Sequence, residues 1–289
     1  MSNKILVTGG AGFIGSHLCE KLAEDLSNKI YSFDNYSTGS KTNHIKGVHY
    51  INGHTKDINN LIDFKVDIIF HLGEYSRVEQ SFDDLDTVYK SNVIGTFEVL
   101  KFCKNNSCRL IYAGSSTKFG DGGAGKNQSP YGWTKASNTE LIKNFSNWYS
   151  LNYAIVYFYN AYGPREIRDG KYSTLIAKFC KQMAEDKPLT IVSPGNQVRN
   201  FTHVYDIISG LIIVGKNGFG DNYGIGNPQS YSVIQIAKIF GGKIKMLPER
   251  QGNRMSAQVH AEKTIELGWK PKYEIIDYVD QIRRNNWEL

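Results

Sequence analysis

The chain has 289 residues, roughly two domain-equivalents, and its hydrophobic share of 40% and charged share of 21% are those of a folded protein. A disordered chain and a small scaffold held by disulfides are therefore excluded. Lys and Arg exceed Asp and Glu by 34 − 28 = +6 without a basic block, which favours an anionic small molecule over nucleic acid as partner. No apolar run approaches about 18 residues and the chain opens on a strand-like run, so we expect no membrane span and a cytoplasmic location.

The cysteines and histidines indicate neither disulfides nor a metal site. The four cysteines lack CxxC spacing, which favours reduced, buried thiols. The histidines that could be considered as ligands lack metal-ligand spacing, so no metal is expected. These residues are Cys19, Cys103, Cys108, Cys180, His44, His49, His71 and His203.

Short apolar runs alternate with amphipathic stretches in the first half of the chain. This alternation predicts strands joined by crossover helices, and hence a parallel sheet. The expected strands are residues 4–8, 29–34, 47–52, 67–72, 108–115 and 154–160, and the expected helices are residues 13–26, 86–105 and 130–150.

After about residue 164 the elements become shorter. Helices are expected near 173–186, 205–215, 232–240 and 275–287, and strands at 189–192 and 198–204. We therefore predict an α/β protein: a doubly wound parallel Rossmann sheet with a second, smaller α/β substrate lobe. Its expected domains are residues 1–160 with about 200–225 for the sheet, and 161–199 with 226–289 for the second lobe.

A glycine run between the first strand and the first helix predicts a dinucleotide site. Gly9 permits a tight turn, Gly12 lets backbone amides approach a pyrophosphate, and Gly15 lets helix and strand pack closely. Asp34 ends the second strand, about twenty residues on, where its carboxylate would bind ribose hydroxyls and repel a 2′-phosphate. NAD is therefore favoured over NADP. The alternatives are a glycine turn needed for packing alone and an Asp34 that serves only as a turn residue.

Ser115, Tyr131 and Lys135 form the candidate catalytic group. Tyr131 and Lys135 are four residues apart near the start of an expected helix, so they share one face and the ammonium can favour the phenolate. A phenolate can take a proton from an alcohol while hydride leaves the same carbon. Ser115 ends the expected fifth strand, at the sheet edge where a nicotinamide would bind. The alternative is a surface Tyr and Lys pair, which the upstream glycine run disfavours.

Together these motifs resemble the extended short-chain dehydrogenase/reductase superfamily, and within it the NAD-dependent epimerase/dehydratase family that acts on nucleotide sugars. The resemblance covers nearly the whole chain. It is carried by TGGAGFIG (8–15), FDNYSTG (33–39), DIIFHL (67–72), NVIGT (92–96), AGSSTKFG (113–120), SPYGWTK (129–135), YNAYGPRE (159–166), RNFTHVYDI (199–207), IGNPQSYSV (225–233), ERQG (249–252) and LGWKP (267–271).

The resemblance implies a role for each matching residue. Tyr131 would be the base, Lys135 would hold the nicotinamide ribose, and Ser115 would bond the reacting sugar hydroxyl. Asn160 would contact the substrate diphosphate region, which Arg199 and Arg250 would grip, although each arginine could instead be a surface charge. The implied cofactor contacts are Gly9, Gly12, Phe13, Ile14, Gly15, Asp34, Asn35, Leu72, Asn92, Tyr131 and Lys135.

Departures from the family pattern narrow the reaction. Ser116 and Thr117 follow Ser115, where the 4,6-dehydratases carry an Asp-Glu pair. Without those acids dehydration is disfavoured, and the missing glutamate at Thr117 also disfavours decarboxylation. Hydride removal and return remain, so a nucleotide-sugar 4-epimerase is the leading hypothesis. The alternatives are a 4-dehydrogenase or ketoreductase of the same family and, from another class, a non-catalytic NAD-binding protein.

Further departures concern the pocket. Ala257, seven places after Arg250, matches a gate position where a small side chain leaves room for an acetamido group, unless it serves packing alone. His54 stands where an Asp usually contacts adenine. Glu74 replaces a small residue after the fourth strand and is either a catalytic acid or a side chain that points to solvent.

By analogy with the family, a homodimer through the helices at 86–105 and 130–150 and a role in surface polysaccharide synthesis are expected.

Overall fold

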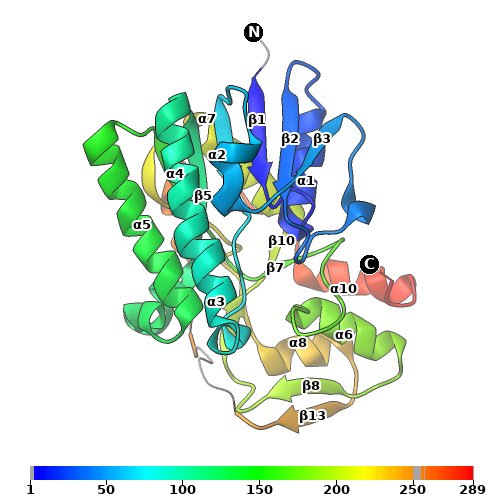
Figure 1. The fold of residues 1–289 in the computed structure, drawn as a ribbon. Coiled ribbons are helices and arrows are strands. Elements are labelled where there is room, and N and C mark those ends of the chain that lie inside the picture. Colours follow the sequence, from blue (N-terminus) through cyan, green and yellow to red (C-terminus); the bar gives the residue numbers. More distant parts are fainter. Residues whose placement is uncertain (1–2, 250–254, 257, 289) are drawn as a thin grey trace.

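The computed structural model describes residues 3–249, 255–256 and 258–288, and a seven-stranded sheet forms its centre (Figure 1). The strand order is β11-β6-β5-β4-β1-β2-β3, and every neighbouring pair is parallel. The predicted fold class is confirmed. The strands are β1 Lys4–Thr8, β2 Lys29–Asp34, β3 Val48–Asn52, β4 Ile68–His71, β5 Arg109–Ser115, β6 Tyr153–Phe158 and β11 Gly220–Ile225.

Helices cover both faces of the sheet. Ile5 and Val7 of β1 face α1 (Phe13–Ala23) and α7 (Val204–Asn217), whereas Leu6 between them faces the opposite layer. Alternate strand residues point to opposite faces, so both sides of β1 are apolar, as expected for a buried parallel strand. The opposite layer consists of α2 Ile58–Leu61, α4 Gly95–Asn106 and α5 Pro130–Tyr149.

The helix expected at residues 86–105 is interrupted. It divides into α3 (Leu85–Val88), a π-helical turn over Tyr89–Ile94, and α4. A π-turn shifts the backbone hydrogen bonds by one residue and re-aims side chains. Here Asn92 points inward, where its Oδ1 accepts the Tyr75 amide at 2.7 Å and its Nδ2 donates to Thr134 Oγ1 at 3.1 Å.

A further hydrophobic cluster lies beyond the carboxyl ends of the strands, and the helices α6 (Leu175–Ala184), α8 (Val233–Phe240) and α10 (Ile275–Arg284) that contribute to it are in the lower half of Figure 1. We call it the C-terminal cluster; Phe179, Phe240 and Tyr278 are among its large buried side chains. The division of the chain into two domains stays a prediction. The other elements outside the sheet layer are β7 Ala161–Tyr162, β8 Leu189–Val192, β9 Val198–Asn200, β10 Thr202–His203, β12 Ser230–Ser232, β13 Ile244–Leu247 and α9 Glu262–Glu266.

All four cysteines are buried and unpaired. Burial raises the pKa of Cys19 and of Cys180 to about 12, and that of Cys103 well above its usual value. Because the thiolate is the reactive form, burial lowers the reactivity of Cys19, Cys103 and Cys180 in the folded protein. Within the described part of the chain, no helix is both long and apolar enough to span a membrane.

Candidate active site

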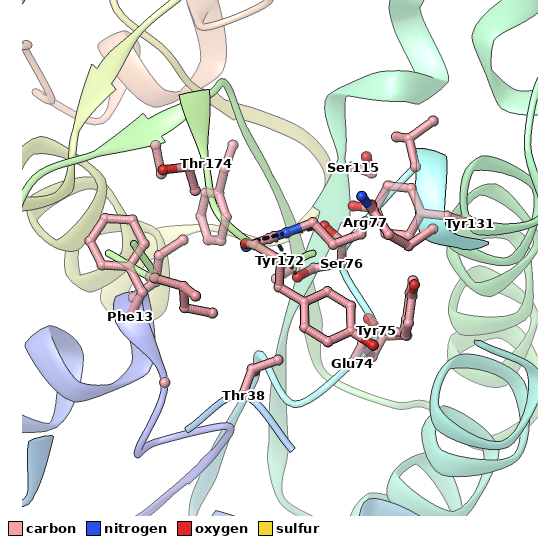
Figure 2. Close-up of a pocket in the computed structure, with 18 of the residues that line it drawn as sticks. Phe13, Thr38, Glu74, Tyr75, Ser76, Arg77, Ser115, Tyr131, Tyr172 and Thr174 are labelled. Atoms are coloured by element: carbon pink, nitrogen blue, oxygen red, sulfur yellow. Dashed lines mark hydrogen bonds between the residues drawn. The ribbon is translucent and has the colours of Figure 1, made fainter. Parts of the chain in front are cut away.

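A cavity of about 940 Å³ lies between the carboxyl ends of the strands and the C-terminal cluster. Its wall starts at the glycine turn after β1, passes Ser115 and Tyr131, and ends at Thr190 and Arg199. Figure 2 shows Ser115 and Tyr131 on the same side of this cavity, with Phe13 on the far side. One cavity thus joins the predicted cofactor end to the predicted substrate end, as the crevice of a doubly wound sheet allows.

The glycine turn has the geometry that a dinucleotide requires. Gly9 adopts a φ of +72°, which favours glycine, and a Cβ at Gly15 would lie only 2.0 Å from the Gly9 carbonyl oxygen. α1 starts after Gly12, and no side chain caps its first amides. These amides line the cavity and carry the positive end of the helix dipole, so the turn fits a diphosphate.

Asp34 has a structural role that the sequence did not reveal. Its Oδ2 accepts the Ala11 amide at 2.9 Å and its Oδ1 accepts the Tyr36 amide at 2.8 Å. The carboxylate therefore ties the glycine turn to the end of β2. Burial raises its pKa. Each oxygen keeps a further lone pair, and Asp34 lines the cavity, so it can still accept hydrogen bonds from a ribose.

Ser115, Tyr131 and Lys135 line the same stretch of the cavity. α5 begins at Ser129, whose hydroxyl accepts the Gly132 amide at 3.0 Å and fixes the first turn, which carries Tyr131. Among the described residues, the Tyr131 hydroxyl has no hydrogen-bond partner, so it is available to a ligand. Ser115 Oγ lies 2.8 Å from Thr117 Oγ1.

Glu74 does not point to solvent, so that alternative is wrong. Its side chain is 2% exposed and forms an ion pair with Lys135 Nζ, which also donates to the Ala113 carbonyl oxygen. The sequence placed Glu74 near the cofactor path, but no local pattern indicated a partner 61 residues away. The fold creates the pair because the chain that follows β4 reaches α5, the helix that carries Lys135.

The remaining predicted cofactor residues differ in whether they line the cavity. Asn92 does not line the cavity; its side chain holds Tyr75 and Thr134 instead. His54 lines the cavity and its Nδ1 accepts the Lys56 amide at 3.2 Å, while burial lowers its pKa. The cavity wall includes Phe13, Ile14, Asn35 and Leu72.

At the substrate end, Asn160 and Arg199 line the cavity. Asn160 Nδ2 donates to the Asn200 carbonyl oxygen at 2.9 Å, and Arg199 Nη1 donates to the Val198 carbonyl oxygen at 2.8 Å. Arg250 and Ala257 lie outside the described residues. The roles of these four residues stay predictions.

The short segment between Ser115 and Tyr131 folds as 3-10 turns over Ser116–Asn127. Asp121 has a φ of +49°, and its Oδ1 accepts the amides of Met255 at 3.2 Å and Ser256 at 3.0 Å. The segment therefore holds the chain next to the predicted gate position. Neither Ser116 nor Thr117 supplies a carboxylate to the cavity wall.

The sequence did not predict that a segment between β7 and α6 lies at the cavity and contacts the chain after β4. We call residues 164–174, between β7 and α6, the strap. Arg77 donates from Nε to the Tyr172 carbonyl oxygen at 2.9 Å, and Asp84 Oδ2 accepts the Tyr172 hydroxyl at 3.0 Å and pairs with Lys171 at 2.7 Å. Figure 2 shows the Arg77 and Tyr172 contact as dashed lines. No sequence pattern marks such pairings between distant segments.

Two buried titratable groups lie near the strap and the sheet edge. Burial raises the pKa of Glu166 to about 7, although the Thr174 hydroxyl and the Gly163 amide, which donate to its carboxylate, oppose that shift. Burial lowers the pKa of His71 to about 4, so this ring is neutral at physiological pH. Its partners are Thr8 Oγ1 at 2.7 Å and Thr96 Oγ1 at 3.0 Å.

Comparisons with known proteins agree with this geometry. The chain matches the model of the NAD dependent epimerase/dehydratase family over residues 5–226, and it belongs to that family. The predicted family and the predicted cofactor, NAD, are thereby confirmed, and the protein is an enzyme of this nucleotide-sugar family.

Individual relatives have different activities. The chain is 30% identical over 300 residues to UDP-glucuronic acid decarboxylase 3 of Arabidopsis thaliana, covering 94% of this chain and 85% of the relative. It is 29% identical to a putative UDP-glucose 4-epimerase of Methanocaldococcus jannaschii, covering 98% and 97%. The crystal structure of UDP-glucose 4-epimerase from Thermotoga maritima matches with a TM-score of 0.88 at 25% identity, covering 98% of this chain and 99% of that one.

Proposed function

We propose that the protein is an NAD-dependent nucleotide-sugar 4-epimerase. The proposal rests on which residues line the cavity. Tyr131, Lys135 and Ser115 line it together, and hydroxyl side chains at Ser116 and Thr117 follow where acids would be needed for other reactions. A site with a base but without a nearby carboxylate at these positions suits reversible alcohol oxidation rather than dehydration or decarboxylation.

Each residue of the site has its own role in the proposed reaction. Ser115 bonds the C4 hydroxyl of the sugar and orients it toward Tyr131, which takes the hydroxyl proton and later returns it. Bound NAD would supply the hydride acceptor at C4 and the hydride donor for the other face of the 4-keto sugar. Lys135 holds the nicotinamide ribose, and Arg199 and Asn160 hold the nucleotide diphosphate while the sugar turns.

Incubation of purified enzyme with UDP-sugars, without added cofactor, tests the proposal. The expected product is a mixture of C4 epimers, resolved by chromatography and mass spectrometry, with NAD still bound after turnover. Absence of turnover across UDP-, GDP- and dTDP-hexoses would contradict it. Release of a keto sugar with stoichiometric cofactor reduction would favour a 4-dehydrogenase, and carbon dioxide release from UDP-glucuronate would favour a decarboxylase, the activity of the relative in Arabidopsis.

We further propose that the enzyme is a homodimer through α4 and α5, which lie side by side at the outer edge of Figure 1. Large apolar side chains are exposed on these helices: Phe97 on α4, and Trp133, Trp148 and Tyr149 on α5. Clusters of exposed apolar residues mark protein interfaces. Sedimentation should show a dimer that Phe97→Glu converts to a monomer; a monomeric native protein would contradict this assembly.

A further inference from the structure

The carboxylate of Glu74 is fully supplied with donors. Oε2 pairs with Lys135 Nζ, and Oε1 accepts Thr96 Oγ1 at 2.8 Å, Asn138 Nδ2 at 2.9 Å and the Tyr112 hydroxyl at 3.1 Å. These donors come from α4, β5 and α5. A buried charge with this many partners is held in one place and is costly to move.

The partner ammonium is fixed as well. Lys135 donates to Glu74 and to the Ala113 carbonyl oxygen, and it lies 4.6 Å from the centre of the Tyr112 ring. An ammonium has three N–H groups, so two are occupied by the protein and one is left for the cavity that Lys135 lines. Without Glu74, a flexible lysine side chain would have several directions open to it.

The pair also sets the charge beside Tyr131. Lys135 follows Tyr131 by one helical turn, so the ammonium and its partner carboxylate place an ion pair, rather than a lone positive charge, in this part of the cavity. The other groups that face this region are Arg77 from the chain after β4, the phenol of Tyr112 from β5, and His71 from β4, which is neutral. Glu166, Tyr75 and Tyr172 face Arg77 in turn.

We propose that Glu74 is a positioning residue for Lys135: it aims one N–H of the ammonium into the cavity and balances the ammonium charge next to Tyr131. Glu74 acts through Lys135 and does not touch the reacting atoms. The inference rests on the proposed function only in taking Tyr131 as the base. The ionisation of Tyr131 can be measured without any turnover, so the two proposals can fail separately.

The test is a double-mutant cycle of Glu74→Gln, Lys135→Met and the combined variant, with the NAD content of each protein matched. The readout is the ultraviolet absorbance of tyrosinate against pH, taken as the difference between each protein and its Tyr131→Phe counterpart. Glu74→Gln should move the appearance of the Tyr131 tyrosinate to lower pH by about one unit, and Lys135→Met should move it to higher pH. The combined variant should titrate like Lys135→Met alone, because Glu74 acts on Tyr131 through the lysine and has no such effect once the ammonium is gone.

Two controls make the result specific. Glu140→Gln removes a carboxylate from the exposed surface of the same helix, where its side chain is 64% exposed, and should leave the tyrosinate transition unchanged. Glu74→Asp keeps the charge and should stay closer to the wild type than Glu74→Gln does. If Glu74→Gln does not fold, the comparison of Lys135→Met with the combined variant, which leaves no unpaired buried charge, decides the question.

An unchanged transition in Glu74→Gln would overturn the proposal. So would a combined variant in which the two single shifts simply add, since the carboxylate would then act on Tyr131 independently of the lysine. If the native enzyme turns over no nucleotide sugar, the proposed 4-epimerase activity fails, and the absorbance cycle still tests Glu74.

Discussion

Arg77 Nε and the carbonyl oxygen of Tyr172 are 2.9 Å apart, and this hydrogen bond joins segments 95 residues apart in the chain. Arg77 follows β4, whereas Tyr172 belongs to the strap and packs against Tyr75. The bond therefore ties the strap to the chain that follows β4, and both residues line the cavity.

Loss of this bond should loosen the strap. A hydrogen bond to a charged group contributes about 1.5–3 kcal/mol, so Arg77→Met is expected to raise KM for the nucleotide sugar by roughly tenfold or more. Hydrogen exchange should become faster at the amides of the strap. Lys171→Met is the comparison within the strap, because it removes an exposed ion pair with Asp84 and a cation–π contact with Tyr172 but leaves the Arg77 bond in place, and it should have a smaller effect. Equal effects of the two variants would argue against the bond as the anchor.

Tyr131→Phe should remove the base while leaving the cavity intact. We expect kcat to fall by roughly 10²- to 10⁴-fold, the usual contribution of a positioned acid or base, with the bound NAD retained. Tyr149→Phe, on the same helix but outside the cavity wall, should be active. A comparable loss in both variants would show that the effect comes from α5 and not from the phenol.

Alanine substitutions at two positions of the glycine turn, Gly15 and Gly12, should have different effects. Gly15→Ala would bring a Cβ to 2.0 Å from the Gly9 carbonyl oxygen, a clash with backbone that must shift the turn, so lower stability and loss of NAD are expected together. At Gly12 the nearest atom is 3.2 Å away, so Gly12→Ala should fold but bind NAD less tightly. Thermal unfolding and the NAD content of the purified variants separate the two effects. Normal NAD content in Gly15→Ala would contradict the assignment of this turn.

The raised pKa of Glu166 predicts that the free energy of unfolding depends on pH. Its pKa is 4.5 in the unfolded chain and about 7 when folded, because burial disfavours the carboxylate. The folded state therefore binds the proton more tightly, and the stability that this provides, roughly 3 kcal/mol, is complete below about pH 4.5 and is lost as the pH rises through about 7. Glu166→Gln should lack this dependence.

The measurement is the free energy of unfolding in denaturant from pH 5 to pH 8, as the difference between the native protein and Glu166→Gln. His71 and His203, whose pKa values burial lowers to about 4, contribute the opposite trend below about 6.5 in both proteins and cancel in that difference. A difference that does not change with pH would contradict the role of Glu166.

Local patterns predicted most of the fold. Residues 4–8, 29–34 and 189–192 form strands with the predicted bounds, because alternation and short apolar runs are written in adjacent residues. The π-turn at Tyr89–Ile94 was not predicted, since a shift of one backbone hydrogen bond changes no composition pattern. The strand β13 was also missed, because its residues are half exposed and carry a mixed sequence.

The candidate site was predictable where a motif is continuous. The glycine turn and the Tyr131 and Lys135 pair belong to short segments with fixed spacing, and the cavity contains them all. The partners of Glu74, Arg77 and Asp34 were not predictable, since each contact depends on where the fold brings a distant segment. The same holds for Asp121, whose carboxylate reaches residues more than 130 positions away.

Because all four native thiols are buried, a cysteine introduced on the strap could be labelled selectively. A single cysteine introduced by Asp169→Cys, at a strap side chain that is 72% exposed, would be the one thiol that reacts with a maleimide dye in the folded protein. No native cysteine would have to be replaced first. Fluorescence from that position would then report whether the strap moves when a nucleotide sugar binds to the otherwise unmodified enzyme.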